Sequence, residues 1–328
     1  MAFLQTYLRY LSYDPTDRDY EAAKEWMTRI RAKIKENELT RAAGTEQELI
    51  NITLSFSDSE NLRTRNIANE LAGLVSTRKT DSIYLPELQT IIGEGIAHMQ
   101  TSRDPMHDTS HVIRAIRFAA ILVSRMKREQ KEIDWGVIVA SIAWHDVYRV
   151  KNRGYLYNKD TRLRKMLRKI PLIVDIDIYL VFKKDSIASA LWFLKESKGR
   201  LPKNLRRKIA IAILGEHSLN AFQESIYPGI SLYKTIVFSA DTLDLASVAR
   251  LHGGWLAVKE RGVMDMLWYN RMLVLNLISG IQKIEFHPSF AIARDLYKSV
   301  IRVTYVYVSR FFPTDAKLLR RMRKAIIE

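Results

Sequence analysis

The feature that most constrains this chain is a small set of metal-competent side chains, each embedded in apolar, helix-forming sequence. His111 opens one such segment, the doublet His145-Asp146 closes the apolar stretch Trp135–Trp144, and Asp241 lies far downstream in a third segment. Burying these polar groups without partners would cost several kcal/mol, so something must satisfy them. Imidazole and carboxylate together suit a divalent ion (Zn, Mn, Fe or Ni, with Mg also open), and the residue types do not choose among these. We therefore predict that His111, His145, Asp146 and Asp241 bind one divalent metal ion.

Apolar residues recur at helical spacing along most of the chain, which predicts an all-α fold. A helix that begins near Ser110, where Asp108, Thr109 or Ser110 can cap the first turn, carries His111 close to its start. The polar stretch Lys127–Glu132 predicts a turn to the next helix, which carries His145 near its end. If these two helices pack side by side and antiparallel, the start of the first lies beside the end of the second. His111 and His145 then come close together, as a shared metal ion requires.

We divide the chain into an N-terminal helical extension over residues 1–80, a main helical domain over 85–280, and further helices over 281–328 that pack on this core. The extension carries no chemistry that we can identify, so its apolar positions are expected to pack on the main domain or on a partner.

The positive charge of the chain is concentrated in one segment. The net charge is +16, and Arg149 to Lys208 holds 18 Lys and Arg against 5 Asp and Glu, a surplus of 18 − 5 = 13. Such a concentration of positive charge attracts phosphate-bearing partners, whether nucleotides, nucleic acid or an anionic membrane surface. A solvated basic surface that only aids solubility is an equally good interpretation.

Other features exclude whole classes of site and location. The chain has no cysteine, which excludes disulfides, thiolate metal sites and cysteine nucleophiles. No window approaches the roughly 20 apolar residues that span a membrane, and the N-terminal residues lack the pattern of a signal peptide. We expect a cytoplasmic protein without a transmembrane segment; nothing in the sequence sets its oligomeric state.

The ordered set of motifs resembles the HD-domain superfamily of metal-dependent phosphohydrolases, whose signature is a His, a His-Asp doublet and a distant Asp. The resemblance covers roughly residues 85–255, and residues 149–208 then read as a basic helical insertion in an HD-domain helical bundle. The matching phrases are His107-Asp108-x-x-His111-x-x-Arg114, His145-Asp146, Glu216-His217-Ser218 and Ala240-Asp241-Thr242-Leu243.

The resemblance implies an enzyme that cleaves a phosphate ester of a nucleotide or related small molecule, as a phosphomonoesterase or phosphodiesterase, through a water that the metal activates. It implies that Asp146 also holds this water and that His217 is a general acid or a phosphate contact. Arg114, one turn after His111, is expected to reach the phosphate, and His107 to support the ligands. Arg149 and Lys151 begin the basic segment and are candidate substrate contacts.

Two other functions stay open. The first is an HD-type nuclease or nucleic-acid processing factor that uses the basic segment 149–208 to hold the polymer, which a steep loss of affinity with salt would support. The second is a non-catalytic helical module whose metal is only structural. Val147-Tyr148-Arg149 after the doublet differs from the continuations typical of alarmone hydrolases, of deoxynucleotide triphosphohydrolases and of cyclic-di-GMP phosphodiesterases. No adjacent His pair follows His217, which argues against the two-metal variants. What remains resembles the small, mononuclear phosphohydrolases.

Overall fold

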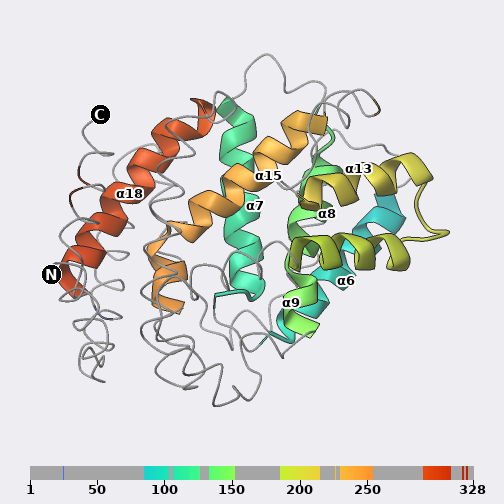
Figure 1. Ribbon diagram of the computed structural model, residues 1–328, viewed down its shortest axis with the longest axis horizontal. Helices are drawn as coiled ribbons and strands as arrows, with labels where there is room; N and C mark the ends of the chain where they lie inside the picture. Colours follow the sequence, from blue (N-terminus) through green and yellow to red (C-terminus); the bar gives the residue numbers. More distant parts are fainter. Residues whose placement is uncertain are drawn as a thin grey trace, which may run out of the picture. The chain divides into compact units, whose positions relative to one another are not determined.

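The computed structural model describes six stretches of the chain and four isolated positions: residues 85–102, 106–125, 133–151, 185–214, 230–253 and 291–311, with 25, 226, 320 and 323. Within this part 87% of residues are helical and none lies in a strand, so the prediction of an all-α fold is confirmed (Figure 1). The predicted extension 1–80, apart from one helical position, and residues 152–184 of the basic segment lie outside the described residues.

The chain divides into two compact units. One comprises Ser57–Tyr155 and Tyr179–Thr242, and the other comprises Met1–Phe56, Leu156–Ile178 and Leu243–Glu328. The boundary therefore falls inside the domain that we predicted over 85–280. The first unit carries all the described residues of the predicted site, and we call it the site unit.

The site unit is built around one short helix that is apolar on every side. Helix α8 (Trp135–Trp144) is buried at all of its residues, as expected for a helix without a polar face. It packs against the helices α6, α7 and α13. Besides α8, the described helices of this unit are α6 (Leu85–Gln100), α7 (Thr109–Arg125), α9 (Val147–Lys151), a helix over 185–196, α13 (Lys203–Leu214) and the part of α15 (Ile230–Leu245) up to residue 242.

Helix α6 approaches α8 closely at a glycine. A Cβ atom placed on Gly95 would lie 2.8 Å from Trp144 Nε1 and 3.0 Å from the carbonyl oxygen of Ala143. The same indole nitrogen donates a hydrogen bond to the carbonyl of Ile91, at 2.9 Å. The missing side chain thus lets the end of α8, where the His-Asp doublet follows, lie directly on α6.

The beginning of α8 is fixed by polar contacts to another helix. Asp134 caps α8 by accepting from the backbone N–H groups of Gly136 and Val137, and its own N–H donates to the hydroxyl of Tyr233 in α15, at 2.8 Å. Midway along α8, the Ser141 hydroxyl lies 3.4 Å from the carbonyl oxygen of Ile209 in α13. These contacts anchor α15 and α13 to the central helix.

The other unit contains the end of α15, a short helical stretch over 248–253 and α18 (Ala291–Phe311). The helix α18 lies within residues 281–328, where we predicted further helices. The Thr304 hydroxyl of α18 donates to the carbonyl of Ala246, at 2.5 Å, and Tyr307 is buried against His252, with 3.0 Å between hydroxyl and Nδ1.

Among the helices that the structure describes, none is both long enough and apolar enough to span a bilayer.

Candidate metal centre

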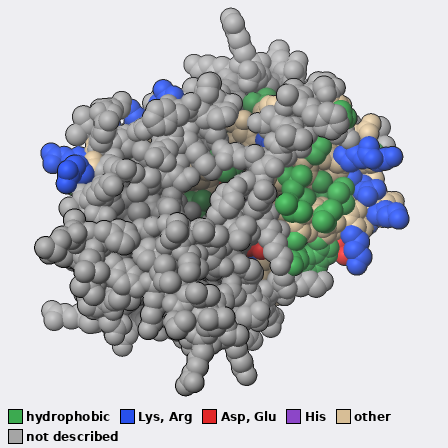
Figure 2. All heavy atoms as spheres, in the orientation of Figure 1, with side chains coloured by type: hydrophobic (Ala, Val, Ile, Leu, Met, Phe, Trp, Pro, Cys, Tyr) green, Lys and Arg blue, Asp and Glu red, His purple; other side chains and the backbone are tan. Residues whose placement is uncertain are grey.

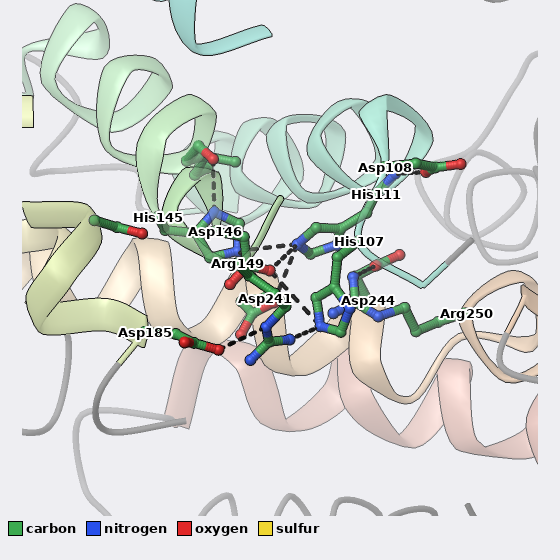
Figure 3. Close-up of polar contacts among 12 residues, drawn as sticks. His107, Asp108, His111, His145, Asp146, Arg149, Asp185, Asp241, Asp244 and Arg250 are labelled. Atoms are coloured by element: carbon green, nitrogen blue, oxygen red, sulfur yellow. Dashed lines mark hydrogen bonds and ion pairs between the residues drawn. The ribbon is translucent and has the colours of Figure 1, made fainter. Parts of the chain in front are cut away.

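Three helices of the site unit bring potential metal ligands to one point (Figure 3). His111 comes from the first turn of α7, His145 directly follows α8, and Asp241 comes from α15. One ligand atom from each of these residues lies within 4.8 Å of the others. The two imidazole Nε2 atoms are 2.9 Å apart, and Asp241 Oδ1 lies 3.5 Å from the one on His111 and 3.7 Å from the one on His145.

The remaining predicted ligand, Asp146, adjoins the same two imidazoles. Its Oδ2 atom lies 3.6 Å from His111 Nε2 and 3.3 Å from His145 Nε2. Because Asp146 stands where α8 has ended and before α9 begins, consecutive side chains of the doublet can turn toward the same point. The structure thus brings the side chains of His111, His145 and Asp241 together with Asp146 beside them, and their binding of a metal ion stays a prediction.

A polar cap sets the position of His111. Asp108 Oδ1 accepts from the backbone N–H groups of Ser110 and His111, at 2.9 and 3.2 Å, and from the Ser110 hydroxyl, at 2.5 Å. A carboxylate at this position satisfies donors that the first turn of a helix leaves unpaired. The cap predicted from the sequence therefore forms, and it holds the backbone that carries the first histidine.

A backbone contact orients His145. Its Nδ1 atom lies 2.6 Å from the carbonyl oxygen of Ile142, which can only accept, so Nδ1 carries a proton. In the neutral ring the lone pair is then on Nε2, the atom that faces the cluster. Metal-binding histidines are commonly fixed in this way, with the far nitrogen bonded to a carbonyl.

The spacing of the donor atoms suits a single ion. Ligands at about 2.1 Å from one ion are separated by roughly 3.0 Å when they subtend a right angle and by about 3.4 Å in a tetrahedron. The separations among His111, His145, Asp146 and Asp241 given above run from 2.9 to 3.7 Å. The ligand atoms of His111, His145 and Asp241 all lie within 4.8 Å of one another, so these three residues fit a divalent cation. Asp146 lies beside them, within 3.6 Å of both imidazole Nε2 atoms.

The electrostatics of the cluster favour positive charge at its centre. Burial lowers the pKa of His145, but Asp146 and Asp241 outweigh that effect and raise it to about 9. Burial raises the pKa of Asp146, yet the cations around it, led by His145 and Arg149, bring it well below its usual range. The carboxylates thus attract either a proton or a metal ion to the imidazoles.

A second polar chain borders the cluster. Arg149 of α9 donates through Nη1 to His107 Nε2 and through Nε to Asp185 Oδ2, the latter at 2.8 Å. All three side chains are buried. His107 Nε2 also lies 3.8 Å from Asp146 Oδ2, so this chain reaches the edge of the ligand group.

The other predicted site residues have different surroundings. Arg114 is buried, and its Nη1 donates to the Ser110 hydroxyl, at 2.9 Å, which joins it to the cap of α7. Arg149 is held by Asp185 and His107 as described above. Lys151 ends α9, and His217 lies outside the described residues. Contact of these four residues with a substrate stays a prediction.

Sequence reasoning missed Asp185. The only available signal was an acidic residue within an apolar, helix-forming stretch of a strongly basic segment, which a charge count treats as a minor exception. Its burial and its pairing with Arg149 depend on the helix over 185–196 returning to α9, which no local pattern encodes.

Comparison of the chain with protein-family models, with curated proteins and with solved structures finds no match.

Proposed function

We propose that this protein is a metal-dependent phosphohydrolase that cleaves a phosphate ester of a nucleotide or related small molecule. The observation that supports it most is the convergence of His111 and His145 with Asp241, within 4.8 Å of one another and with Asp146 beside them. Two imidazoles and two carboxylates from three separate segments of the chain form the kind of site that mononuclear hydrolases use to hold a divalent ion. The order of these residues in the sequence, which resembles the HD signature, supports the same proposal.

The residues have distinct roles in this proposal. A divalent ion held by His111, His145, Asp146 and Asp241 would lower the pKa of a water and polarise a phosphoryl oxygen. Asp146 is ionised over the neutral range, since its pKa is held low, so one of its oxygens can accept a hydrogen bond from the attacking water. The attack on phosphorus then depends mainly on positioning and on neutralising charge.

The decisive experiment combines metal analysis with a turnover screen. The full-length protein, purified without chelator, is analysed for bound metals and then tested for phosphate release from nucleotides and other phosphate esters with Mn, Ni, Mg, Fe or Zn. We expect about one metal ion per chain and turnover of a small phosphate ester. Absence of metal at saturating concentrations would refute the proposal.

Two matched variants test whether metal binding and turnover depend on the cluster of His111, His145, Asp146 and Asp241. Asp146→Ala is expected to lose both metal and turnover while keeping its helical circular dichroism. His98→Gln is the control, because His98 is a half-buried histidine of the same unit that packs on the rings of Trp144 and Trp192 instead of facing the ligands. An unaltered metal content in Asp146→Ala would contradict the assigned ligand set.

A nuclease or nucleic-acid-binding function is the second candidate, and one surface favours it. Lys195, Lys198, Lys203 and Arg207 are exposed on the helix over 185–196, on α13 and on the residues between them, close to the exposed apolar side chain of Leu191. Figure 2 shows Lys and Arg side chains bordering an apolar area on one face. Cations that neutralise phosphates make binding fall steeply with salt.

The two candidates are separated by the substrate that is turned over. Cleavage of single-stranded polynucleotide but not of nucleotides, with affinity that falls with salt and falls further in a Lys195→Ala/Lys198→Ala variant, would favour the nuclease. Turnover of a nucleotide that is unchanged in this variant would favour the small-molecule enzyme.

A further inference from the structure

The unusual feature of the centre is a third histidine that lies within reach of a metal but is bonded elsewhere. His107 is buried, and its Nε2 lies 3.8 Å from Asp146 Oδ2, an atom that also lies within 3.6 Å of the Nε2 atoms of His111 and His145. Asp146 Oδ2 is thus close to three imidazole nitrogens. By distance alone, His107 is placed to join a metal held at this carboxylate.

Arg149 occupies the lone pair that such a bond would need. Its Nη1 donates to His107 Nε2, and a guanidinium cannot lose its proton at neutral pH or act as an acceptor. His107 Nε2 must therefore be the acceptor, and the proton of the neutral ring is on Nδ1. A nitrogen that accepts from Arg149 has no lone pair left for a metal ion.

Asp185 keeps Arg149 in this position. The carboxylate accepts from Arg149 Nε at 2.8 Å, and both side chains are almost completely buried. A guanidinium presents its N–H groups in a rigid planar fork, so fixing Nε also fixes the direction of Nη1. Asp185 lies 36 residues from Arg149, so the helix over 185–196 determines how His107 is bonded.

We propose that the buried Arg149–Asp185 pair withholds His107 from the metal and so limits the imidazole ligands to His111 and His145. This inference rests on the proposed metal centre. It assigns Arg149 and Asp185 as positioning residues that act through His107. It also explains why a histidine so close to Asp146 supports the ligand set without belonging to it.

The test replaces the pair by apolar side chains of similar size, Arg149→Met/Asp185→Leu. Removing one cation and one anion together leaves the net charge unchanged, so a change in metal binding would not arise from a change in total charge. Replacing both partners also avoids a buried unpaired charge, which is the main reason that single substitutions in such pairs prevent folding.

The readout is the number of imidazole nitrogens around Co²⁺ bound to the full-length protein, measured by X-ray absorption and pulsed electron paramagnetic resonance. We expect the wild type to show two imidazoles, and the Arg149→Met/Asp185→Leu variant to show three. Adding His107→Phe to that variant is expected to return the number to two.

A milder substitution gives an independent check. Arg149→Lys keeps a cation beside Asp185, but it replaces the separate nitrogens Nε and Nη1, held in one rigid plane, by a single nitrogen. It is therefore expected to release His107 and to show three imidazoles as well, in a protein that retains the buried ion pair.

The outcomes separate this inference from the proposed function. Three imidazoles in the wild type, or two in both folded variants, would overturn the role of Arg149 and Asp185 while leaving the metal centre intact. A wild type that binds no Co²⁺ would overturn the metal centre and this inference with it.

Discussion

The Nε2 atoms of His111 and His145 lie 2.9 Å apart, although 34 residues separate the two histidines in the chain. His145 directs a lone pair along this line when its ring is neutral, because its Nδ1 donates to the carbonyl of Ile142. Two imidazole nitrogens at this distance are stable only with a proton or a cation between them. The carboxylates of Asp146 and Asp241 favour either one, so proton and metal compete for the same place.

Metal addition is therefore expected to stabilise the protein. A ligand that binds only the folded state at 100 times its dissociation constant adds about 2.7 kcal/mol to the free energy of unfolding. We expect Mn²⁺ or Zn²⁺ to raise the thermal midpoint in calorimetry and a chelator to reverse the effect. Asp241→Ala removes one ligand and is expected to lose most of this increment; an equal increment in the variant would place the metal elsewhere.

Stability of the metal-free protein is expected to fall as the pH rises. The pKa of His145 is raised from 6.5 to about 9 in the folded protein. A raised pKa means that the folded state binds the proton more tightly, so the stabilisation is fully present below about pH 6.5 and is lost as the pH passes about 9. The shift corresponds to a loss on the order of 3 kcal/mol.

Urea denaturation of the chelated protein at about pH 6 and about pH 9.5 measures this loss. His145→Gln cannot gain the proton and is expected to flatten the dependence on pH over this range. A wild type and a variant with the same slope would show that another group is responsible.

The centre could be predicted from sequence because its parts are local. His111 follows a capping residue, and His145-Asp146 ends a stretch so apolar that it had to be a central helix. Asp241 lies in a helical segment whose spacing carries no such signal. Its residue type within helix-forming sequence and its match to the HD signature singled it out together. The polar chain of His107, Arg149 and Asp185 that borders the cluster could not be predicted in the same way. The pairing of Arg149 with Asp185, and the bond of Arg149 to His107, depend on how distant helices pack, whereas the sequence showed only a basic segment and suggested a substrate contact.

The need for a glycine at position 95 likewise depends on helix packing that the sequence does not reveal, and it gives a further prediction. Nothing beside it in the sequence demands a glycine; the demand comes from Trp144, whose indole nitrogen would lie 2.8 Å from an added Cβ. We expect Gly95→Ala to destabilise the protein by about 1–3 kcal/mol through overpacking. It would also displace the end of α8, and so weaken metal binding.

Gly93 is the matched control, since it lies in the same helix and an added Cβ would meet nothing within 4 Å. There the substitution to alanine is expected to stabilise the helix by about 0.5–1 kcal/mol. Chemical denaturation of both variants measures the difference, and the prediction fails if the two substitutions change stability in the same direction.

Two ion pairs of similar length are expected to differ in their contribution to stability. Arg250 lies 3.2 Å from Asp244, with side chains 3% and 0% exposed, whereas Arg200 lies 2.8 Å from Glu94, with side chains 33% and 39% exposed. Removing Arg250 leaves the buried carboxylate of Asp244 without its cation, which costs about 3–5 kcal/mol. Solvent screens the exposed pair, so Arg200→Ala is expected to cost at most about 1 kcal/mol.

Calorimetry of Arg250→Ala and Arg200→Ala tests this order, and a larger loss in Arg200→Ala would show that burial does not control the strength of these pairs. The double variant Arg250→Met/Asp244→Leu is expected to recover much of the loss, because it removes the buried carboxylate together with its cation.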